Sequence, residues 1–518
     1  MRGRDLRTAR IAIIGAGVGG LAAALDLTRA GFEVLVFERA MAPGGKLREV
    51  EIGGLRMDAG PTVFTLRSVF DQLFADAGES LDRHLKLIPA DILARHAWDS
   101  SGHLDLFADP HRSADAIWQF AGAREAHGFM RFVAQAKRIY TTLENPFIRA
   151  SRPSPVDLVR RVGMGGLGDL WNIQPFASLW QSLAGYFSDP RLRQLFGRYA
   201  TYCGSSPFLA PAVLMLVAHV EQAGVWYIDG GMHRLAAALA ALAQRRGAEF
   251  RYGSEVTKIH ARNGRVSAIE VLGREPIAVD AIVCNADSNA LAGGMFGDAA
   301  SNGVNATPTG RRSLSALTWN LVARTEGFDL AHHSVFFSTD YRAEFDDIFR
   351  RHRLPTAPTI YLCAQDRRDA TGIRPQQPER LLCLVNAPPI GDTHIFDSAE
   401  IATCETRVFS RLEKFGLSVH RQQNASLATS PQDFNRLFPS TGGALYGPAS
   451  HGWAASFRRA GSRTAMPGLY LAGGSTHPGP GLPMAATSGR LAAACVIEDH
   501  ASIARSHSVA MPGGTSMP

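Results

Sequence analysis

Short apolar runs separated by helical, amphipathic segments open this sequence, which is the pattern of strands and helices in an open α/β sheet. The run Ile11–Ile14 leads into a Gly-rich turn, after which Leu21–Ala30 has helical periodicity and ends at Gly31. A second strand is expected at Glu33–Phe37. These segments predict a βαβ unit at the start of the chain.

The strand and helix signals return after a long helical and loop region, expected between Ser68 and Gly224. A mixed segment with several strand-like runs is expected from about Ser301 to Ser450. The later elements predicted are helices at Leu235–Arg246 and Pro483–Asp499, and strands at Phe250–Ile259, Ala281–Cys284, Thr359–Cys363, Leu381–Val385 and Leu469–Ala472.

A chain of 518 residues is too long for one ordinary core, so more than one domain is expected. We predict a fold of the α/β + α+β class, with a Rossmann-like nucleotide-binding domain and a discontinuous second domain. The first is assigned residues 8–80, 225–300 and 450–500, the second residues 81–224 and 301–449, and a disordered tail residues 505–518.

Composition limits the classes of protein and the compartment. Hydrophobic residues make up 46% and charged residues 19%, which argues against extensive disorder. The apolar run Leu209–Val220 is too short to cross a bilayer, and no secretion signal is visible. The six cysteines are scattered, so reduced thiols in a cytoplasmic protein are expected. The net charge is +7, but the sequence has no cluster of Lys and Arg interleaved with aromatic residues. This argues against nucleic acid as a partner, whereas attachment to a membrane surface stays possible.

The Gly-rich turn has the spacing Gly15-x-Gly17-x-x-Gly20, with Glu38 at the end of the next strand. Gly15 permits a tight turn, Gly17 lets the backbone approach a pyrophosphate, and Gly20 allows close helix–strand packing. The helix N-terminus then faces the phosphate charge, and Glu38 accepts hydrogen bonds from a ribose. The turn therefore predicts a dinucleotide site, to which Gly19 and Arg39 also contribute.

A second G-x-G-x-x-G match, Gly163–Gly168, lacks this context. It follows a helical turn, and no strand ending in an acidic residue comes after it. We interpret it as a loop, so a second site for NAD(P) is not supported.

The segment after Glu38 resembles the flavin-dependent amine oxidase and phytoene desaturase superfamily. It contains Pro43-Gly-Gly-Lys46 and Asp58-Ala-Gly-Pro-Thr62. The resemblance implies FAD as the cofactor, because the G-G-[RK] element completes its pyrophosphate site, and a returning strand lies against the adenine. The residues this assigns to FAD are Gly44, Gly45, Lys46, Gly60, Pro61, Thr62 and Val256.

The segment Gly468–Arg490, which contains His477-Pro-Gly-Pro-Gly, resembles the closing flavin motif of bacterial carotenoid desaturases. In that motif a Gly-rich turn, here Gly473-Gly474, lets the isoalloxazine lie against backbone. The amides of the following helix point at the N1/O2 edge of the flavin and favour hydride acceptance. The residues at that helix start are Leu482, Pro483 and Met484.

The resemblance covers the chain from Ile11 to about Asp499. The segments Gly230–Leu235, Pro358–Asp366 and Leu482–Arg490 are similar to the 1-hydroxycarotenoid 3,4-desaturases. This implies FAD-dependent C-3,4 dehydrogenation of a long acyclic 1-hydroxy or 1-methoxy carotenoid, with phytoene desaturation as the alternative. Oxygen or a quinone is expected to accept the electrons.

Desaturation beside a polyene needs no strong catalytic base. Hydride loss leaves a delocalised cation, and the second hydrogen then leaves as a proton. His477 is the candidate base, and the alternative is a loop histidine held by backbone hydrogen bonds. Asp287 and Asp366 are weaker candidates.

The low solubility of the expected substrate also indicates where in the cell the protein works. Moving about forty carbons into water costs roughly 30 kcal/mol at ~0.8 kcal/mol per CH₂, so substrate should come directly from a bilayer. We expect a cytoplasmic protein peripherally associated with the inner or intracytoplasmic membrane. A stripe of apolar side chains is the hypothetical docking face, with a core stripe as the alternative: Trp171, Ile173, Phe176, Leu179, Trp180, Leu183 and Phe187.

Three other functions remain open from the sequence. A flavin amine oxidase shares the expected fold and would turn over soluble amines. A carotenoid isomerase would leave the product mass unchanged. A non-enzymatic prenyl-lipid escort protein would not need the intact flavin fingerprint.

Overall fold

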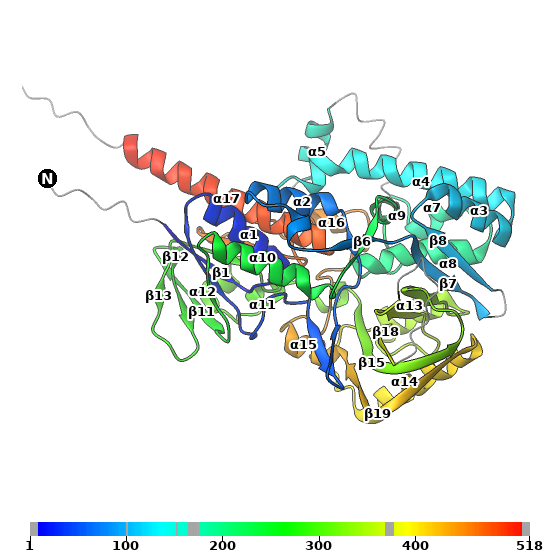
Figure 1. Ribbon diagram of the computed structural model, residues 1–518. Coiled ribbons are helices and arrows are strands. Elements are labelled where there is room, and N and C mark those ends of the chain that lie inside the picture. Colours follow the sequence, from blue (N-terminus) through cyan, green and yellow to red (C-terminus); the bar gives the residue numbers. More distant parts are fainter. Residues whose placement is uncertain are drawn as a thin grey trace, which may run out of the picture.

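A five-stranded parallel sheet carries the N-terminal βαβ unit (Figure 1). The computed structural model describes residues 9–99, 102–151, 154–163, 174, 176–367 and 378–509. The sheet order is β10-β2-β1-β14-β20, and the strands come from separated parts of the chain. Their bounds are β1 Arg10–Ile14, β2 Glu33–Phe37, β10 Glu249–Arg251, β14 Ala281–Cys284 and β20 Leu469–Leu471.

Both faces of this sheet are covered, which explains why its strands are continuous apolar runs. One face packs against the helices α1 (Val18–Arg29), α10 (His233–Arg245) and α17 (Leu482–Val509). The other face packs against a small antiparallel sheet of β11 (Val256–Arg262), β12 (Arg265–Val271) and β13 (Ile277–Ala278).

A mixed seven-stranded sheet lies apart from the first, with the order β19-β15-β18-β17-β16-β7-β8 (Figure 1). Its faces differ because side chains alternate along each strand. In β18, Leu381 and Cys383 pack toward α14 (Ser398–Lys414), whereas Leu382 and Leu384 line a cavity. The bounds are β7 Ile92–Ala97, β8 His103–Phe107, β15 Ser315–Gly327, β16 His333–Phe336, β17 Ile360–Ala364, β18 Glu379–Ala387 and β19 Leu417–Thr429.

Helices with an aromatic core pack beside the seven-stranded sheet. Phe132, Phe187 and Phe196 contact one another with ring centroids 4.7–5.6 Å apart. The main helical elements are α3 Pro110–Ala121, α4 Ala123–Leu143, η3 Glu144–Ile148, α5 Pro155–Val162, α7 Leu179–Leu183, α8 Pro190–Gly197, η5 Arg198–Cys203 and α9 Leu216–Gln222.

Shorter strands and helices connect these layers. The strands β3 and β4 form a hairpin, and β9 pairs with both β5 and β6. Their bounds are β3 Glu49–Ile52, β4 Leu55–Asp58, β5 Phe64–Thr65, β6 Leu87–Pro89 and β9 Val225–Ile228, with α2 at Arg67–Asp76, α11 at Ser288–Ala292, α13 at Tyr341–Phe349, α15 at Pro431–Leu437 and α16 at Ala455–Arg458.

The predicted α/β framework is confirmed, and three predictions are wrong in detail. The strand predicted at Phe250–Ile259 is two strands in different sheets, because the chain turns at Gly253, where φ is +59°. The region predicted as helix and loop contains β7 and β8. The last helix continues past Asp499 to Val509, since no Gly or Pro lies between these two residues, so residues 505–509 are helical.

The domain boundaries stay a proposal. The five-stranded sheet draws its strands from all three segments assigned to the nucleotide-binding domain, and the seven-stranded sheet draws on both inserted segments. The second Gly-rich match beyond Gly163, and the tail beyond residue 509, lie outside the described residues. Within the described parts of the chain, no helix is long and apolar enough to cross a membrane.

Candidate functional site

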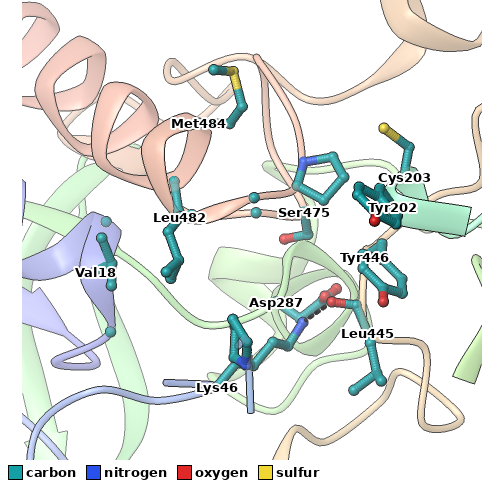
Figure 2. A pocket seen from close by; sticks show the side chains of 18 of the residues that line it. Val18, Lys46, Tyr202, Cys203, Asp287, Leu445, Tyr446, Ser475, Leu482 and Met484 are labelled. Carbon is teal, nitrogen blue, oxygen red and sulfur yellow. Dashed lines mark hydrogen bonds between the residues drawn. The ribbon is translucent and has the colours of Figure 1, made fainter. Parts of the chain in front are cut away.

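A cavity of ≈ 840 Å³ begins at the carboxyl ends of β1, β2 and β14 and reaches the seven-stranded sheet and the helical layer. The carboxyl edge of a parallel sheet is where such folds bind ligands. In Figure 2, Val18 and Leu482 lie on one side of this cavity, and Tyr202, Cys203 and Tyr446 lie on the other.

The N-terminus of α1 opens onto the cavity without a capping side chain. Its N-cap is Gly17, no acidic residue lies in the first turn, and Gly15 before it has φ of +97°. The first N–H groups of a helix have no intrahelical acceptor, and the helix dipole favours an anion there. The turn can therefore hold a phosphate group, as its sequence predicts.

The glycines of this turn are needed for close packing. A Cβ on Gly20 would lie 2.2 Å from the carbonyl oxygen of Gly15, which agrees with the predicted packing role. A Cβ on Gly44 would lie 2.2 Å from the Leu47 carbonyl oxygen, and Gly44 forms a bridge with Gly17. Larger residues at Gly20 and Gly44 would clash with these backbone carbonyl oxygens and distort the turn and the segment that follows β2.

Asn285, at the end of β14, fills the space between the turn and the C-terminal loop. Cβ atoms on Gly17 and Gly19 would each lie 2.6 Å from its side-chain amide, and one on Gly473 would lie 2.9 Å from it. The sequence shows Asn285 only as the residue that follows a predicted strand. Its packing on three separate glycines becomes visible only in the fold.

Glu38 lies at the end of β2 with its carboxylate held by two backbone amides. Its Oε2 accepts a hydrogen bond from Ala16 N at 2.7 Å and its Oε1 accepts one from Ala40 N at 2.9 Å. A carboxylate has about four acceptor positions, so it can still accept from ribose hydroxyls. Arg39 and Val256 line the same end of the cavity, as predicted.

Lys46 is half-buried on the cavity wall, and desolvation lowers the pKa of its ammonium group. The ammonium donates a hydrogen bond to the Leu445 carbonyl at 2.7 Å and lies in the field of Asp287 (Figure 2). Its charge therefore has partners within the protein, and its predicted contribution to the pyrophosphate site stays a prediction.

The C-terminal loop approaches the cavity through backbone. Gly473 has φ of +110°, and its amide donates to the Ser488 hydroxyl at 3.2 Å. Arg459 donates to the carbonyls of Tyr446, Pro448 and Gly474, and burial lowers the pKa of its guanidinium to about 10. This arginine, which the sequence analysis did not single out, joins the loop to the segment before it.

The described structure gathers nearly all the predicted cofactor residues on this one cavity. Gly20 packs behind it, and His477 does not line it. Their contacts with the cofactor stay predictions. The predicted residues that line the cavity are Gly15, Gly17, Gly19, Glu38, Arg39, Gly44, Gly45, Lys46, Gly60, Pro61, Thr62, Val256, Gly473, Gly474, Leu482, Pro483 and Met484.

The geometry does not support His477 as the base. Its Nε2 lies 2.8 Å from the Phe147 carbonyl oxygen, to which it donates, and the side chain is buried. Burial lowers the pKa of this imidazole to about 4, so it is neutral at pH 7. The alternative, a loop histidine held by backbone, agrees with the structure.

The cavity has an apolar arm that runs from the cofactor end into the helical layer. Its walls come from α4, η3, α5, η6 (Ala212–Met215) and α9. Leu143, Phe147, Ile148, Leu158, Val213, Leu214, Leu216, Val217 and Val220 line it. A wall of this kind fits a long hydrocarbon and excludes water.

The predicted apolar stripe divides between core and surface. Leu179, Leu183 and Phe187 are fully buried, whereas Phe176 is 69% exposed and lines the cavity. The stripe is therefore mainly core, and Trp171 and Ile173 lie outside the described residues.

A polar group on the cavity wall was missed by sequence reasoning. It consists of Arg198, Tyr202 and Glu221, in which Arg198 donates to the Tyr202 hydroxyl at 2.9 Å and Tyr202 donates to Glu221 at 3.1 Å. The spacing of Arg198 and Tyr202, four residues apart in an apolar segment, was the available signal.

The residues fit a flavin dinucleotide. The cavity joins the uncapped N-terminus of α1, the Glu38 carboxylate, which can accept from hydroxyl groups, and a Gly-lined backbone loop that leads into the N-terminus of α17. Neither helix has an acidic residue in its first turn. Together with the apolar arm, this defines an FAD-dependent oxidoreductase for an apolar substrate. The chain belongs to the flavin-containing amine oxidoreductase family, whose model matches residues 18–497, and FAD is its cofactor.

Relatives with curated functions are similar over nearly the full length. A hydroxyneurosporene desaturase of Rubrivivax gelatinosus is 52% identical over 99% of this chain and 97% of its own. One from Cereibacter sphaeroides is 44% identical over 96% and 99%. A 1-hydroxycarotenoid 3,4-desaturase of Flavobacterium is 30% identical over 93% and 97%.

Solved structures share the fold at lower identity. An oxidoreductase from Methanosarcina mazei superposes with a TM-score of 0.60 at 15% identity, over 94% of this chain and 100% of its own. A cyclohexylamine oxidase from Brevibacterium oxydans superposes with a TM-score of 0.56 at 16% identity, over 95% and 100%.

Proposed function

We propose that this protein is a carotenoid desaturase that introduces the C-3,4 double bond of a 1-hydroxy or 1-methoxy acyclic carotenoid. The observation that carries the proposal is the 52% identity to a hydroxyneurosporene desaturase over 99% of the chain. The cavity supports it, because one space joins the predicted cofactor residues to an apolar arm.

Bound FAD supplies a hydride acceptor. The protein contributes the arm, which holds the polyene away from water and directs one end of it toward the C-terminal loop. The start of α17, which has no acidic residue in its first turn, adds partial positive charge at that end, which stabilises negative charge developing on the cofactor side. The dry walls strengthen this electrostatic effect.

The second hydrogen leaves as a proton from a carbon acidified by its cationic neighbour, so a weak acceptor suffices. Of the predicted bases, His477 is neutral but donates its Nε2–H to Phe147. Asp287 lines the cavity, where it accepts from Asn289 N as the N-cap of α11. Asp366 pairs with Arg380 away from the cavity. We therefore assign no catalytic base.

A reconstitution tests this proposal. Purified protein with FAD is given liposomes carrying a 1-hydroxylated acyclic carotenoid, or phytoene, and products are read by absorption and mass. Loss of two hydrogens with a red shift from the hydroxylated substrate, but not from phytoene, supports the proposal. Turnover of phytoene would instead favour a phytoene desaturase, and a shifted spectrum at unchanged mass would favour an isomerase.

The same reconstitution identifies the electron acceptor, for which dioxygen and a quinone are the candidates. Turnover is compared in air, under anaerobic conditions, and under anaerobic conditions with a quinone in the liposomes. Activity that needs air assigns dioxygen, and activity restored by the quinone assigns the quinone.

We also propose peripheral attachment to a membrane at the open end of the apolar arm. Large apolar side chains are exposed there: Val156 is 66% exposed, Phe176 69% and Trp453 50%. Phe176 and Trp453 both line the cavity and contact each other edge-on at 5.6 Å. The adjacent helix α5 carries Arg160 and Arg161 in its last turn, which suits anionic lipid.

Liposome flotation tests the attachment. The variant V156D/W453D is compared with I395D, because Ile395 is 75% exposed and lies outside the cavity. We expect the first variant to lose most liposome binding and the control to keep it. Equal binding by both variants would refute attachment at this surface.

A further inference from the structure

Arg198 is a cation on the wall of the cavity with most of its hydrogen-bonding capacity unused. It begins η5 and is half-buried. Among the described residues, its side chain donates one hydrogen bond, to the Tyr202 hydroxyl, and the groups that act on its charge are tyrosines. A guanidinium has five N–H donors and no acceptor. Several donors are therefore left without an acceptor from the described protein.

The neighbours of Arg198 hold it in place and cannot use those donors. The guanidinium lies over the rings of Tyr202, at 5.1 Å, and Tyr361, at 5.4 Å. The Tyr361 hydroxyl is already paired with Thr62 and His333, both at 2.7 Å. The cation thus has one acceptor for its five donors, and leaving the other donors unpaired when a ligand excludes water would be costly.

A nearby tyrosine adds a second polar group without a partner. The hydroxyl of Tyr341, which also lines the cavity, is buried and forms no hydrogen bond. Donors left over on Arg198, together with the unpaired Tyr341 hydroxyl on the same cavity wall, point to a ligand that carries an acceptor atom.

This cluster lies close to the predicted flavin end of the cavity. Tyr361 joins it to Thr62, which follows Gly60-Pro61, and Figure 2 places Tyr202 beside Tyr446 and Ser475 at the C-terminal loop. In a 1-hydroxylated substrate that reacts at C-3 and C-4, two carbon–carbon bonds separate C-1 from C-3. At ~1.5 Å per bond, the hydroxyl oxygen lies roughly 4 Å from the reacting bond. An oxygen-binding group is therefore required beside the flavin.

We propose that Arg198 binds the oxygen atom on C-1 of the carotenoid, held in position by Tyr202 and Tyr361. The inference rests on the proposed function and identifies a specificity-determining residue for it. A hydroxyl or methoxy oxygen accepts a hydrogen bond from the guanidinium, whereas a hydrocarbon end leaves the donors unpaired. Sites built to pair with a polar atom reject analogues that lack it.

The test measures binding separately from turnover. Quenching of tryptophan fluorescence gives the affinity of the FAD-loaded protein, in detergent micelles, for a 1-hydroxylated acyclic carotenoid and for the hydrocarbon of the same chain length. We expect wild type to prefer the hydroxylated compound roughly 10- to 100-fold, the range for a hydrogen bond to a charged group. Arg198→Met should bind both equally. Arg350→Met, which removes an exposed guanidinium on α13, should keep the preference.

Arg198→Gln keeps N–H donors without the charge and should retain a smaller preference, so it decides the question if the methionine variant does not fold. An undiminished preference in the Arg198 variants that fold, with normal FAD content, would overturn the proposal. So would a wild-type protein without preference. Turnover is scored separately: loss of the preference in Arg198→Met supports the role of Arg198 even if wild type makes no 3,4-double bond, in which case the proposed function alone fails.

Discussion

The crossing of α1 and α17 provides the strongest test of how this protein builds its cofactor site. At this crossing a Cβ on Gly489 would lie 2.0 Å from the carbonyl oxygen of Gly19. Gly489 is buried in the middle of a helix, where alanine is the better helix former. The substitution Gly489→Ala therefore sets local helix propensity against tertiary packing.

The energy cost of the packing clash in Gly489→Ala is expected to exceed the gain in helix propensity. Alanine gains about 1 kcal/mol over glycine inside a helix. Ordinary carbon–oxygen contacts are about 3.3 Å, so the helices must separate by roughly 1 Å. Overpacking of this kind costs typically 1–3 kcal/mol and occasionally more, particularly when the clash is with backbone that cannot rotate away. A clash with backbone falls in the upper half of that range, so we expect a net destabilisation on the order of 1–2 kcal/mol. Because the entropy of unfolding of a 518-residue chain is about 1 kcal/mol/K, this lowers the thermal midpoint by about 1–2 °C.

The same displacement should weaken FAD binding, since both helix N-termini face the cofactor cavity. The assay is thermal unfolding at fixed scan rate and fixed FAD, together with FAD affinity by fluorescence titration. Gly310→Ala is the matched control, because a Cβ there meets nothing within 4 Å. A Gly489→Ala protein that is as stable as wild type or more stable, with unchanged FAD affinity, would refute the packing argument.

Three further predictions follow from buried charge, protonation and cofactor binding. Arg490→Met should destabilise the protein by roughly 3–5 kcal/mol, because Arg490 pairs with Asp26 and Asp76 and would leave buried Asp26 without that partner; equal denaturation midpoints for variant and wild type would contradict this. Burial lowers the pKa of His477 from 6.5 to about 4, so the unfolded state takes up a proton first as the pH falls. The wild-type protein should therefore lose up to about 3 kcal/mol of stability between pH 6.5 and pH 4. His477→Gln should flatten that part of the profile of stability against pH, and parallel profiles for the two proteins would contradict the assignment. Removing FAD should lower the thermal midpoint, and adding it back at about 100 times its Kd should restore roughly 2.7 kcal/mol; a midpoint that does not respond to FAD would argue against cofactor binding to the folded state.

The cofactor half of this protein could be predicted from the sequence because its signals are local. The Gly15–Gly20 turn, its flanking strands and Glu38 lie within one βαβ unit, and strand, turn and helix each leave a pattern in consecutive residues. Gly20 packs as predicted, and residues as distant as Thr62, Val256 and Met484 line one cavity.

Features that depend on packing between distant segments could not be predicted in the same way, in either half of the cavity. Asn285 reads as an ordinary strand end until the fold brings it against the glycines at 17, 19 and 473. The stripe at Leu179 and Phe187 has the same periodicity whether it faces a membrane or a core, and only the aromatic layer around it shows that it is core. His477 illustrates the limit for chemistry, since its sequence motif does not reveal where its ring points.

The separation of the cavity into a cofactor half and a substrate half also explains how one fold serves different reactions. The cyclohexylamine oxidase superposes over 95% of this chain although 16% of residues are identical, so the framework constrains few side chains. In this chain, steric constraints lie at glycines where a side chain would meet backbone, such as Gly20 and Gly489. The seven-stranded sheet has more freedom. In β18, Leu381, Cys383, Val385 and Ala387 form a core with α14, while Leu382, Leu384 and Asn386 line the cavity. Substitutions on the cavity face can change the substrate without disturbing the core, because alternate side chains point in opposite directions. A charged residue such as Arg198, opposite that face and outside the cofactor turn, is therefore where substrate choice can be altered while the flavin site is kept.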